Sequence, residues 1–75
     1  NNMALQITGL ERIFRFKNNG TEIKLNDPNP DSSPEQVMSL YSNQYPELTT
    51  ATVHGPVVED GKALYEFKTT IGTKG

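Results

Sequence analysis

Residues 26–48 read NDPNPDSSPEQVMSLYSNQYPEL, a stretch that places one short helix between proline-rich boundaries. Pro28 and Pro30 lack a backbone N–H and favour extended backbone in the residues before them. The segment that contains them therefore predicts a stiff, extended connection that cannot be a central strand. This connection and the helix after it divide the chain into two flanking parts.

The helix has a complete start signal and a stop signal. Ser33 is placed as the N-cap, Pro34 as the first helical residue, and Gln36 as the partner of Ser33 in a capping box. Pro46 cannot continue a helix, so the pattern predicts a helix from residue 34 to about residue 44. Apolar side chains at spacings of three and four are expected to line its buried face: Val37, Leu40 and Tyr41.

The part before the helix predicts a β-hairpin. Residues 10–17 have the two-residue periodicity of a strand, which directs Phe14 and Phe16 toward the core and the charges outward. The two parities are Leu10, Arg12, Phe14 and Phe16, and Glu11, Ile13, Arg15 and Lys17. The Asn-Gly pair at 19–20 favours a tight turn, because both residue types tolerate positive φ. Residues 21–25 then form the return strand.

The part after the helix predicts a second hairpin. Residues 49–58 form its first strand, with a bulge or bend at Gly55 and Pro56. The Asp-Gly pair at 60–61 is a second tight-turn signal, and residues 63–70 form the returning strand.

The element order, ββαββ, predicts an α+β fold in which one helix packs on one face of a four-stranded mixed sheet. If the first and last strands pair in parallel at the centre of the sheet, the fold is a β-grasp, the architecture of ubiquitin. We expect a single domain over residues 3–71 and a flexible C-terminal tail over residues 72–75. The expected core consists of these side chains: Phe14, Phe16, Ile23, Leu25, Val37, Leu40, Tyr41, Val53, Tyr65 and Phe67.

Composition narrows the range of functions. The chain has 75 residues, no cysteine, and a formal charge of −2, with seven basic side chains spread among nine acidic ones. This distribution does not indicate direct nucleic-acid binding, and Arg12, Arg15 and Lys17 are interpreted as the solvated face of one strand. The absence of cysteine favours a cytoplasmic location, and no apolar run is long enough to indicate a membrane span.

The sequence contains no pattern typical of catalysis, so we expect neither an enzyme nor a cofactor. His54 is the sole histidine, and without cysteine the chain has no His/Cys set for zinc. Asp27, Asn29 and Asp31 have the spacing that opens a calcium loop, but Ser32 replaces the required glycine and a methionine replaces the required glutamate. We therefore expect no metal site there, and instead a turn whose side chains bond to their own backbone.

Two surface features remain as candidates for function. On the outward parity of the sheet, Ile13 and Leu64 would lie on adjacent strands, with Thr52 and His54 beside them. Such a patch would suit protein docking, although isolated exposed apolar residues are also ordinary. The small-residue tail after the last strand would fit a narrow active site, or it is a frayed end.

Taken together, these motifs resemble the PRTRC system protein C family, which is encoded on bacterial plasmids and other mobile elements and is similar to prokaryotic ubiquitin-like proteins. The likeness covers nearly the whole chain. It rests on these matches: Met3-Ala4-Leu5, Arg12-Ile13-Phe14, Asp27-Pro28-Asn29-Pro30, Ser33-Pro34-Glu35, residues 45–51 (YPELTTA) and residues 72–75 (GTKG).

The resemblance implies a modifier that is activated at its C-terminal carboxylate. The implied partners are a ubiquitin-activating-type adenylating enzyme, a conjugating-enzyme-like protein and a JAB-type peptidase. Gly72 and Gly75 would form the conjugation tail, although the chain ends in Lys74-Gly75 where ubiquitin has a glycine pair. The resemblance also admits a non-covalent adaptor in a plasmid-partitioning, ParB-like complex.

A third alternative, direct contact with DNA in a partitioning apparatus, makes a specific structural demand. Four basic side chains would have to form one patch: Arg12, Arg15, Lys17 and Lys68. Binding would then weaken steeply with salt.

Overall fold

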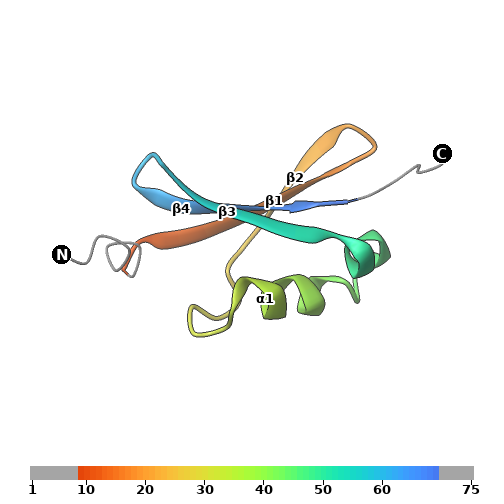
Figure 1. Ribbon diagram of the computed structural model, residues 1–75, viewed down its shortest axis with the longest axis horizontal. Helices are drawn as coiled ribbons and strands as arrows, with labels where there is room; N and C mark the ends of the chain where they lie inside the picture. Colours follow the sequence, from red (N-terminus) through yellow and green to blue (C-terminus); the bar gives the residue numbers. More distant parts are fainter. Residues whose placement is uncertain (1–8, 70–75) are drawn as a thin grey trace.

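The computed structural model of the chain describes residues 9–69 and confirms the predicted element order (Figure 1). A short 3₁₀ helix, η2, is the one addition to the predicted elements of this range. The bounds are as follows: β1, Glu11–Asn18; β2, Thr21–Leu25; α1, Pro34–Tyr41; η2, Pro46–Thr50; β3, Thr52–Glu59; β4, Lys62–Lys68.

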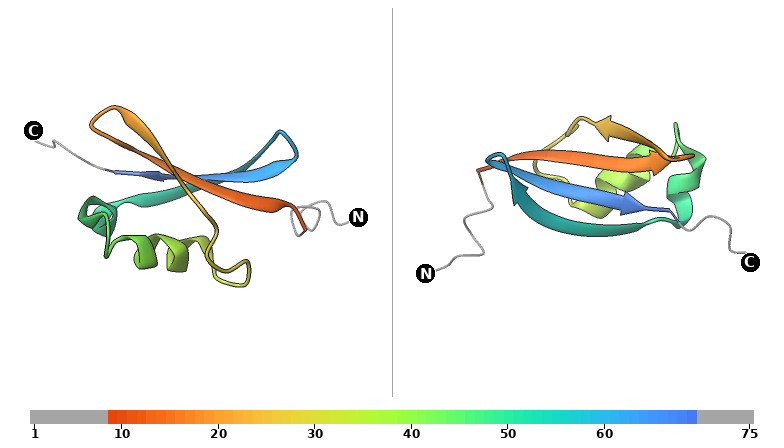
Figure 2. Two further views of the ribbon diagram at one scale, coloured as in Figure 1. Left: turned by 180° about the vertical axis from the view of Figure 1, so that it is seen from behind. Right: turned by 90° about the horizontal axis from the view of Figure 1, so that it is seen from above.

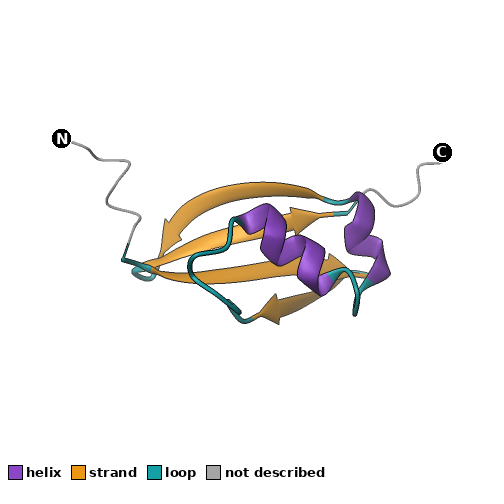
Figure 3. Cartoon of the chain, turned by 90° about the horizontal axis from the view of Figure 1, so that it is seen from below, coloured by secondary structure: helices purple, strands orange, loops and turns teal. Residues whose placement is uncertain are grey.

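The four strands form one sheet in the order β2-β1-β4-β3. Strands β1 and β4 pair in parallel at the centre, and the two hairpin pairs, β1 with β2 and β3 with β4, are antiparallel. Helix α1 lies across one face of the sheet, as Figures 1 and 3 show. This is the ubiquitin-like β-grasp arrangement that the sequence predicted.

Both predicted hairpin turns are confirmed by their backbone angles. Asn19 and Gly20 have φ of 55° and 82°, and Asp60 and Gly61 have φ of 55° and 72°. Two successive residues with positive φ match the right-handed twist of the flanking strands. Asparagine, aspartate and glycine occupy these positions because they tolerate this conformation best.

The predicted irregularity at Gly55 and Pro56 is confirmed as a break in the β3–β4 register between His54 and Val57. The peptide bond between Gly55 and Pro56 is cis. The strand begins later than predicted, at Thr52, because the preceding residues form η2.

The start of α1 is as predicted, but its end is not. Ser33 Oγ accepts a hydrogen bond from the Gln36 backbone N–H, and Gln36 Oε1 accepts one from the Ser33 N–H. The helix ends at Tyr41, three residues before the predicted end. Beyond that point, Ser42 and Asn43 donate side-chain hydrogen bonds to carbonyl groups of the last helical turn, which competes with continuation of the helix.

The core lies between α1, η2 and the sheet. It lacks the predicted Leu40 and includes three residues that were not predicted, Leu48, Ala51 and Ala63. The predicted Ile23, Tyr41 and Val53 are partly buried and pack against it. Leu40 is wrong as a core residue, since 52% of it is exposed. The packed helix face contains Val37, Met38 and Tyr41, which leaves Leu40 at its side. Leu48 on η2 is 1% exposed and was missed, because a single 3₁₀ turn between the helix and the strand has no periodicity to recognise. The buried residues are Phe14, Phe16, Leu25, Val37, Leu48, Ala51, Ala63, Tyr65 and Phe67.

Candidate functional site

The sheet has two faces with different surroundings. One packs against α1, and within residues 9–69 no helix lies over the other, which we call the outer face (Figures 2 and 3). Side chains alternate along each strand, so residues that flank the buried Phe14, Phe16, Tyr65 and Phe67 point outward. The outer face carries these residues: Glu11, Ile13, Arg15 and Lys17 on β1; Glu22 and Lys24 on β2; Thr52, His54, Val57 and Glu59 on β3; Lys62, Leu64, Glu66 and Lys68 on β4.

Three apolar side chains lie in register across the outer face. Ile13 of β1 pairs with Leu64 of β4, and Leu64 pairs with Val57 of β3. We call this set the apolar row. Ile13 and Leu64 are half-buried and Val57 is 59% exposed, so the row presents apolar surface to solvent.

The outward position of Val57 was not predicted, because the bulge changes which residues of β3 point outward. Simple alternation from His54 directs Pro56 and Val58 outward. The register break between His54 and Val57 moves the outward position to Val57 and Glu59 instead, because one extra residue in a strand exchanges the two faces. The sequence indicated an irregularity at Gly55 and Pro56, but not how the strand pairs with β4 after it.

The other two patch residues lie farther from the apolar row. His54 pairs with Glu66, in the next row toward the start of β3, and Thr52 pairs with Lys68, one row beyond. Thr52 Oγ1 and His54 Nε2 are 3.0 Å apart, within hydrogen-bond distance. His54, Val57 and Leu64 line one shallow hollow of about 200 Å³. The predicted patch is thus a strip, with Thr52 at its margin.

Charged side chains surround the apolar row. Ile13 and Leu64 form part of a second hollow, of about 250 Å³, whose other lining residues are charged. Arg15 lies 3.9 Å from Glu22 and 3.7 Å from Glu66. Partly exposed pairs at these distances contribute little to stability, so these side chains can exchange them for ion pairs with a partner at little cost.

Arg12 is not on the solvated strand face, which corrects the interpretation of the basic group in β1. It shares the inner face with Phe14, and its guanidinium carbon lies 5.2 Å from the centre of that ring. The Arg12 side chain is 13% exposed. Arg12 therefore cannot join Arg15, Lys17 and Lys68 in one basic patch, as direct DNA contact would require.

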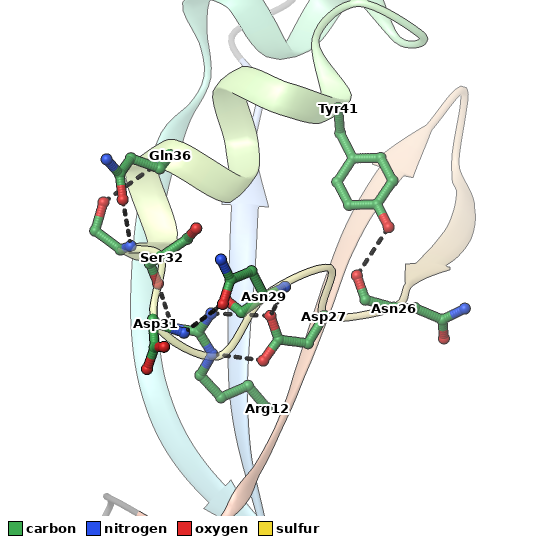
Figure 4. A network of polar contacts seen from close by, with 9 residues as sticks. Arg12, Asn26, Asp27, Asn29, Asp31, Ser32, Gln36 and Tyr41 are labelled. Atoms are coloured by element: carbon green, nitrogen blue, oxygen red, sulfur yellow. Dashed lines mark hydrogen bonds and ion pairs between the residues drawn. The ribbon is translucent and has the colours of Figure 1, made fainter.

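The guanidinium of Arg12 instead holds the extended connection before α1 (Figure 4). Arg12 Nε and Nη2 donate to the two carboxylate oxygens of Asp27, at 2.8 and 2.9 Å. Nη1 donates to the Ser32 carbonyl at 2.8 Å, and Nη2 also donates to the Asn29 carbonyl at 2.9 Å. Four of its five N–H groups are therefore satisfied. No sequence pattern had indicated this network.

The regularly spaced polar side chains in this connection form hydrogen bonds with its own backbone, as predicted. Asp27 Oδ1 accepts from the Asn29 N–H at 3.2 Å, and Asn29 Oδ1 accepts from the Asp31 N–H at 2.9 Å (Figure 4). The Tyr41 hydroxyl donates to the Asn26 carbonyl at 2.8 Å and ties the connection to α1. Among residues 9–69, no three His, Cys, Asp or Glu side chains gather as metal ligands would.

The Arg12–Asp27 pair makes stability depend on pH. The hydrogen bond from Arg12 lowers the pKa of Asp27, so folding favours the ionised carboxylate. The contribution of the ionised Asp27 to folding stability is complete above the pKa of the unfolded chain, ~3.9, and is lost as pH falls through the lower pKa of the folded state. Urea unfolding from pH 7 downward should therefore show the stability advantage of the wild type over Asp27→Asn shrinking below about pH 4. A constant difference would contradict this role.

The predicted conjugation residues, Gly72 and Gly75, lie outside the described residues, as do both ends of the predicted domain range. Within residues 9–69, no helix has the length and apolar character that crossing a membrane requires.

Comparison with known proteins supports the relationship that the fold indicates. The family described as Prokaryotic Ubiquitin matches residues 6–73 of the chain, a range that includes both hairpins, α1 and the apolar row. Comparisons with curated proteins and with solved structures gave no significant match. The match covers most of the chain, and the ββαββ sheet order agrees with it. This protein therefore belongs to the prokaryotic ubiquitin family.

Proposed function

We propose that the protein is a non-enzymatic ubiquitin-like modifier of a PRTRC system, and that it docks on an adenylating enzyme through its outer face. The observation that supports this most directly is the apolar row, Ile13, Leu64 and Val57, on a sheet face that no described helix covers. Membership in the prokaryotic ubiquitin family supports the role of a modifier.

In this proposal, docking and reaction involve different parts of the chain. The outer face supplies binding energy through apolar contact, and the surrounding charges orient the partner. We propose that Gly75 supplies the reacting carboxylate, which attacks the α-phosphate of ATP, forms an acyl adenylate and releases pyrophosphate. A partner thiol then displaces AMP, and a target amine displaces the thiol. A conjugating-enzyme-like protein and a JAB-type peptidase would act after activation.

The test of activation is ATP–pyrophosphate exchange with the adenylating partner. We expect exchange with the full chain and none after deletion of Gly75. If exchange is absent, or is unchanged by that deletion, the covalent function is wrong. Complex formation that persists without exchange would instead identify the non-covalent adaptor of a ParB-like complex.

Two adjacent valines offer a matched test of the docking face. Val57 is 59% exposed on the outer face, and Val58 is 56% exposed but pairs with the buried Ala63 and so belongs to the other face. We expect Val57→Asp to weaken binding to the adenylating enzyme at least about tenfold, and Val58→Asp to change it little. Titration calorimetry would measure both. Ile13→Asp and Leu64→Asp should weaken binding in the same direction.

Equal weakening by the two valine substitutions would contradict docking through the apolar row. Circular dichroism of each variant checks that the fold is retained.

A further inference from the structure

Charge on the outer face is not evenly distributed, because the apolar row separates two bands of opposite sign. The band toward the end of β1 has four basic and two acidic residues: Arg15, Lys17, Lys24, Lys68, Glu22 and Glu66. The band toward the start of β1 has three acidic residues and one basic: Glu11, Glu59, Asp60 and Lys62. We call these the basic band and the acidic band.

From this arrangement we infer that the outer face binds a second copy of the same chain as an antiparallel, face-to-face dimer. A half-turn about an axis along the apolar row brings the two outer faces together and reverses the strand direction. Each apolar residue then meets its own counterpart, and each basic band meets the acidic band of the other copy. The surface is complementary to itself in its apolar row and in its charge, as an isologous interface requires.

Side chains in both bands are available for these contacts. Within the described part of the chain, Lys17, Lys24, Lys62 and Lys68 form no ion pair, and Arg15 has its two partners at 3.7 and 3.9 Å. Two stacked sheets with ~10 Å between them and strands within ~30° of each other are a common packing of twisted sheets. The dimer therefore needs no rearrangement of the fold.

The size of the face indicates a weak association. Four strands of five to eight residues, at ~3.3 Å per residue and ~4.8 Å apart, give a face of roughly 400–500 Å² per copy. The total, about 800–1,000 Å², is at the low end for specific interfaces and is typical of weak, reversible association. The dimer covers the same apolar row as the proposed enzyme docking, so the two partners compete for it.

The dimer rests on the same surface as the proposed enzyme docking, but its test needs only the purified full chain. Dimer formation and enzyme docking can therefore each fail without the other. Sedimentation equilibrium up to roughly 1 mM protein should show the average mass rising toward that of a dimer. The association constant should fall between about 0.05 M and about 0.5 M NaCl, because the bands are exposed. Val57→Asp should weaken association at least about tenfold, and Val58→Asp should not.

A charge exchange tests the antiparallel arrangement itself. In one variant, Lys24→Glu and Lys68→Glu make the basic band acidic; in the other, Glu59→Lys and Asp60→Asn make the acidic band basic. Each variant alone should be monomeric, since its two bands repel those of an identical copy. Mixed together, they should form a heterodimer with both contacts restored.

Three results would overturn the inference, provided that circular dichroism shows folded variants. These are a wild-type chain that stays monomeric at low salt, equal effects of the two valine substitutions, and charge-exchanged variants that do not associate on mixing. Binding of the adenylating enzyme by a strictly monomeric chain would assign the face to that partner instead.

Discussion

Replacing Arg12 with glutamine is expected to lower the free energy of unfolding by about 2–4 kcal/mol. The substitution removes two hydrogen bonds to Asp27, whose side chain is 14% exposed, and leaves that carboxylate without its cation. It also frees the Asn29 and Ser32 carbonyls, so the connection before α1 loses its attachment to β1. Urea unfolding at pH 7 measures the loss.

Arg15 provides the matched control on the same strand. Its side chain is 34% exposed, and its ion pairs are 3.7 and 3.9 Å long. Arg15→Gln should therefore change the free energy of unfolding by no more than about 1 kcal/mol. In a double-mutant cycle, Arg12→Gln and Asp27→Asn should together cost less than the sum of the single losses. Equal losses at both arginines, or additive losses at Arg12 and Asp27, would show that the network does not hold the connection.

Replacing Gly55 with alanine is expected to cost about 3 kcal/mol or more. Gly55 has a φ of 112°, a conformation that L-residues rarely adopt. A Cβ atom there would lie 2.7 Å from the Leu64 carbonyl oxygen and 3.3 Å from the Tyr65 Cα, and both are backbone atoms of the central strand β4. Relief of this contact requires β3 and β4 to separate, which would disturb the β3–β4 ladder and the outer face together.

Gly61 separates the effect of backbone angle from that of crowding. It also has positive φ, 72°, but a Cβ atom there would meet nothing within 4 Å. Gly61→Ala should therefore cost about 1–2 kcal/mol, the usual penalty for the left-handed region. Thermal unfolding of both variants measures the difference, and equal destabilisation would contradict the contact between Gly55 and β4.

The sequence predicted most of the fold because its signals act between near neighbours. A capping box needs Ser33 and Gln36 three residues apart, and a tight hairpin needs two successive residues that tolerate positive φ. The predicted helix end was wrong because the short polar side chains of Ser42 and Asn43 donate hydrogen bonds to carbonyl groups of the last turn. The helix therefore ends ahead of Pro46. Leu48 was missed because a single 3₁₀ turn has no periodicity to recognise.

The candidate site was predicted in part. Alternation along β1 and β4, combined with the β-grasp strand order, placed Ile13 beside Leu64. Val57 could not be placed, because the phase of β3 after Gly55 depends on how the bulge is paired with β4. The docking and dimer proposals both depend on that phase, since it decides which valine completes the apolar row.

Steric and hydrogen-bonding preferences over a few residues suffice to specify the elements, their order, the turns and the capped helix, so these could be predicted from the sequence. The contacts of Arg12 and the separation of charge on the outer face depend on tertiary packing instead. The charge of Arg12 is tolerated at an inward position of β1 because the Asp27 carboxylate, fifteen residues away in sequence, forms an ion pair with it. The two charged bands arise from side chains on four strands, which parallel pairing of β1 with β4 and the bulge in β3 bring into register.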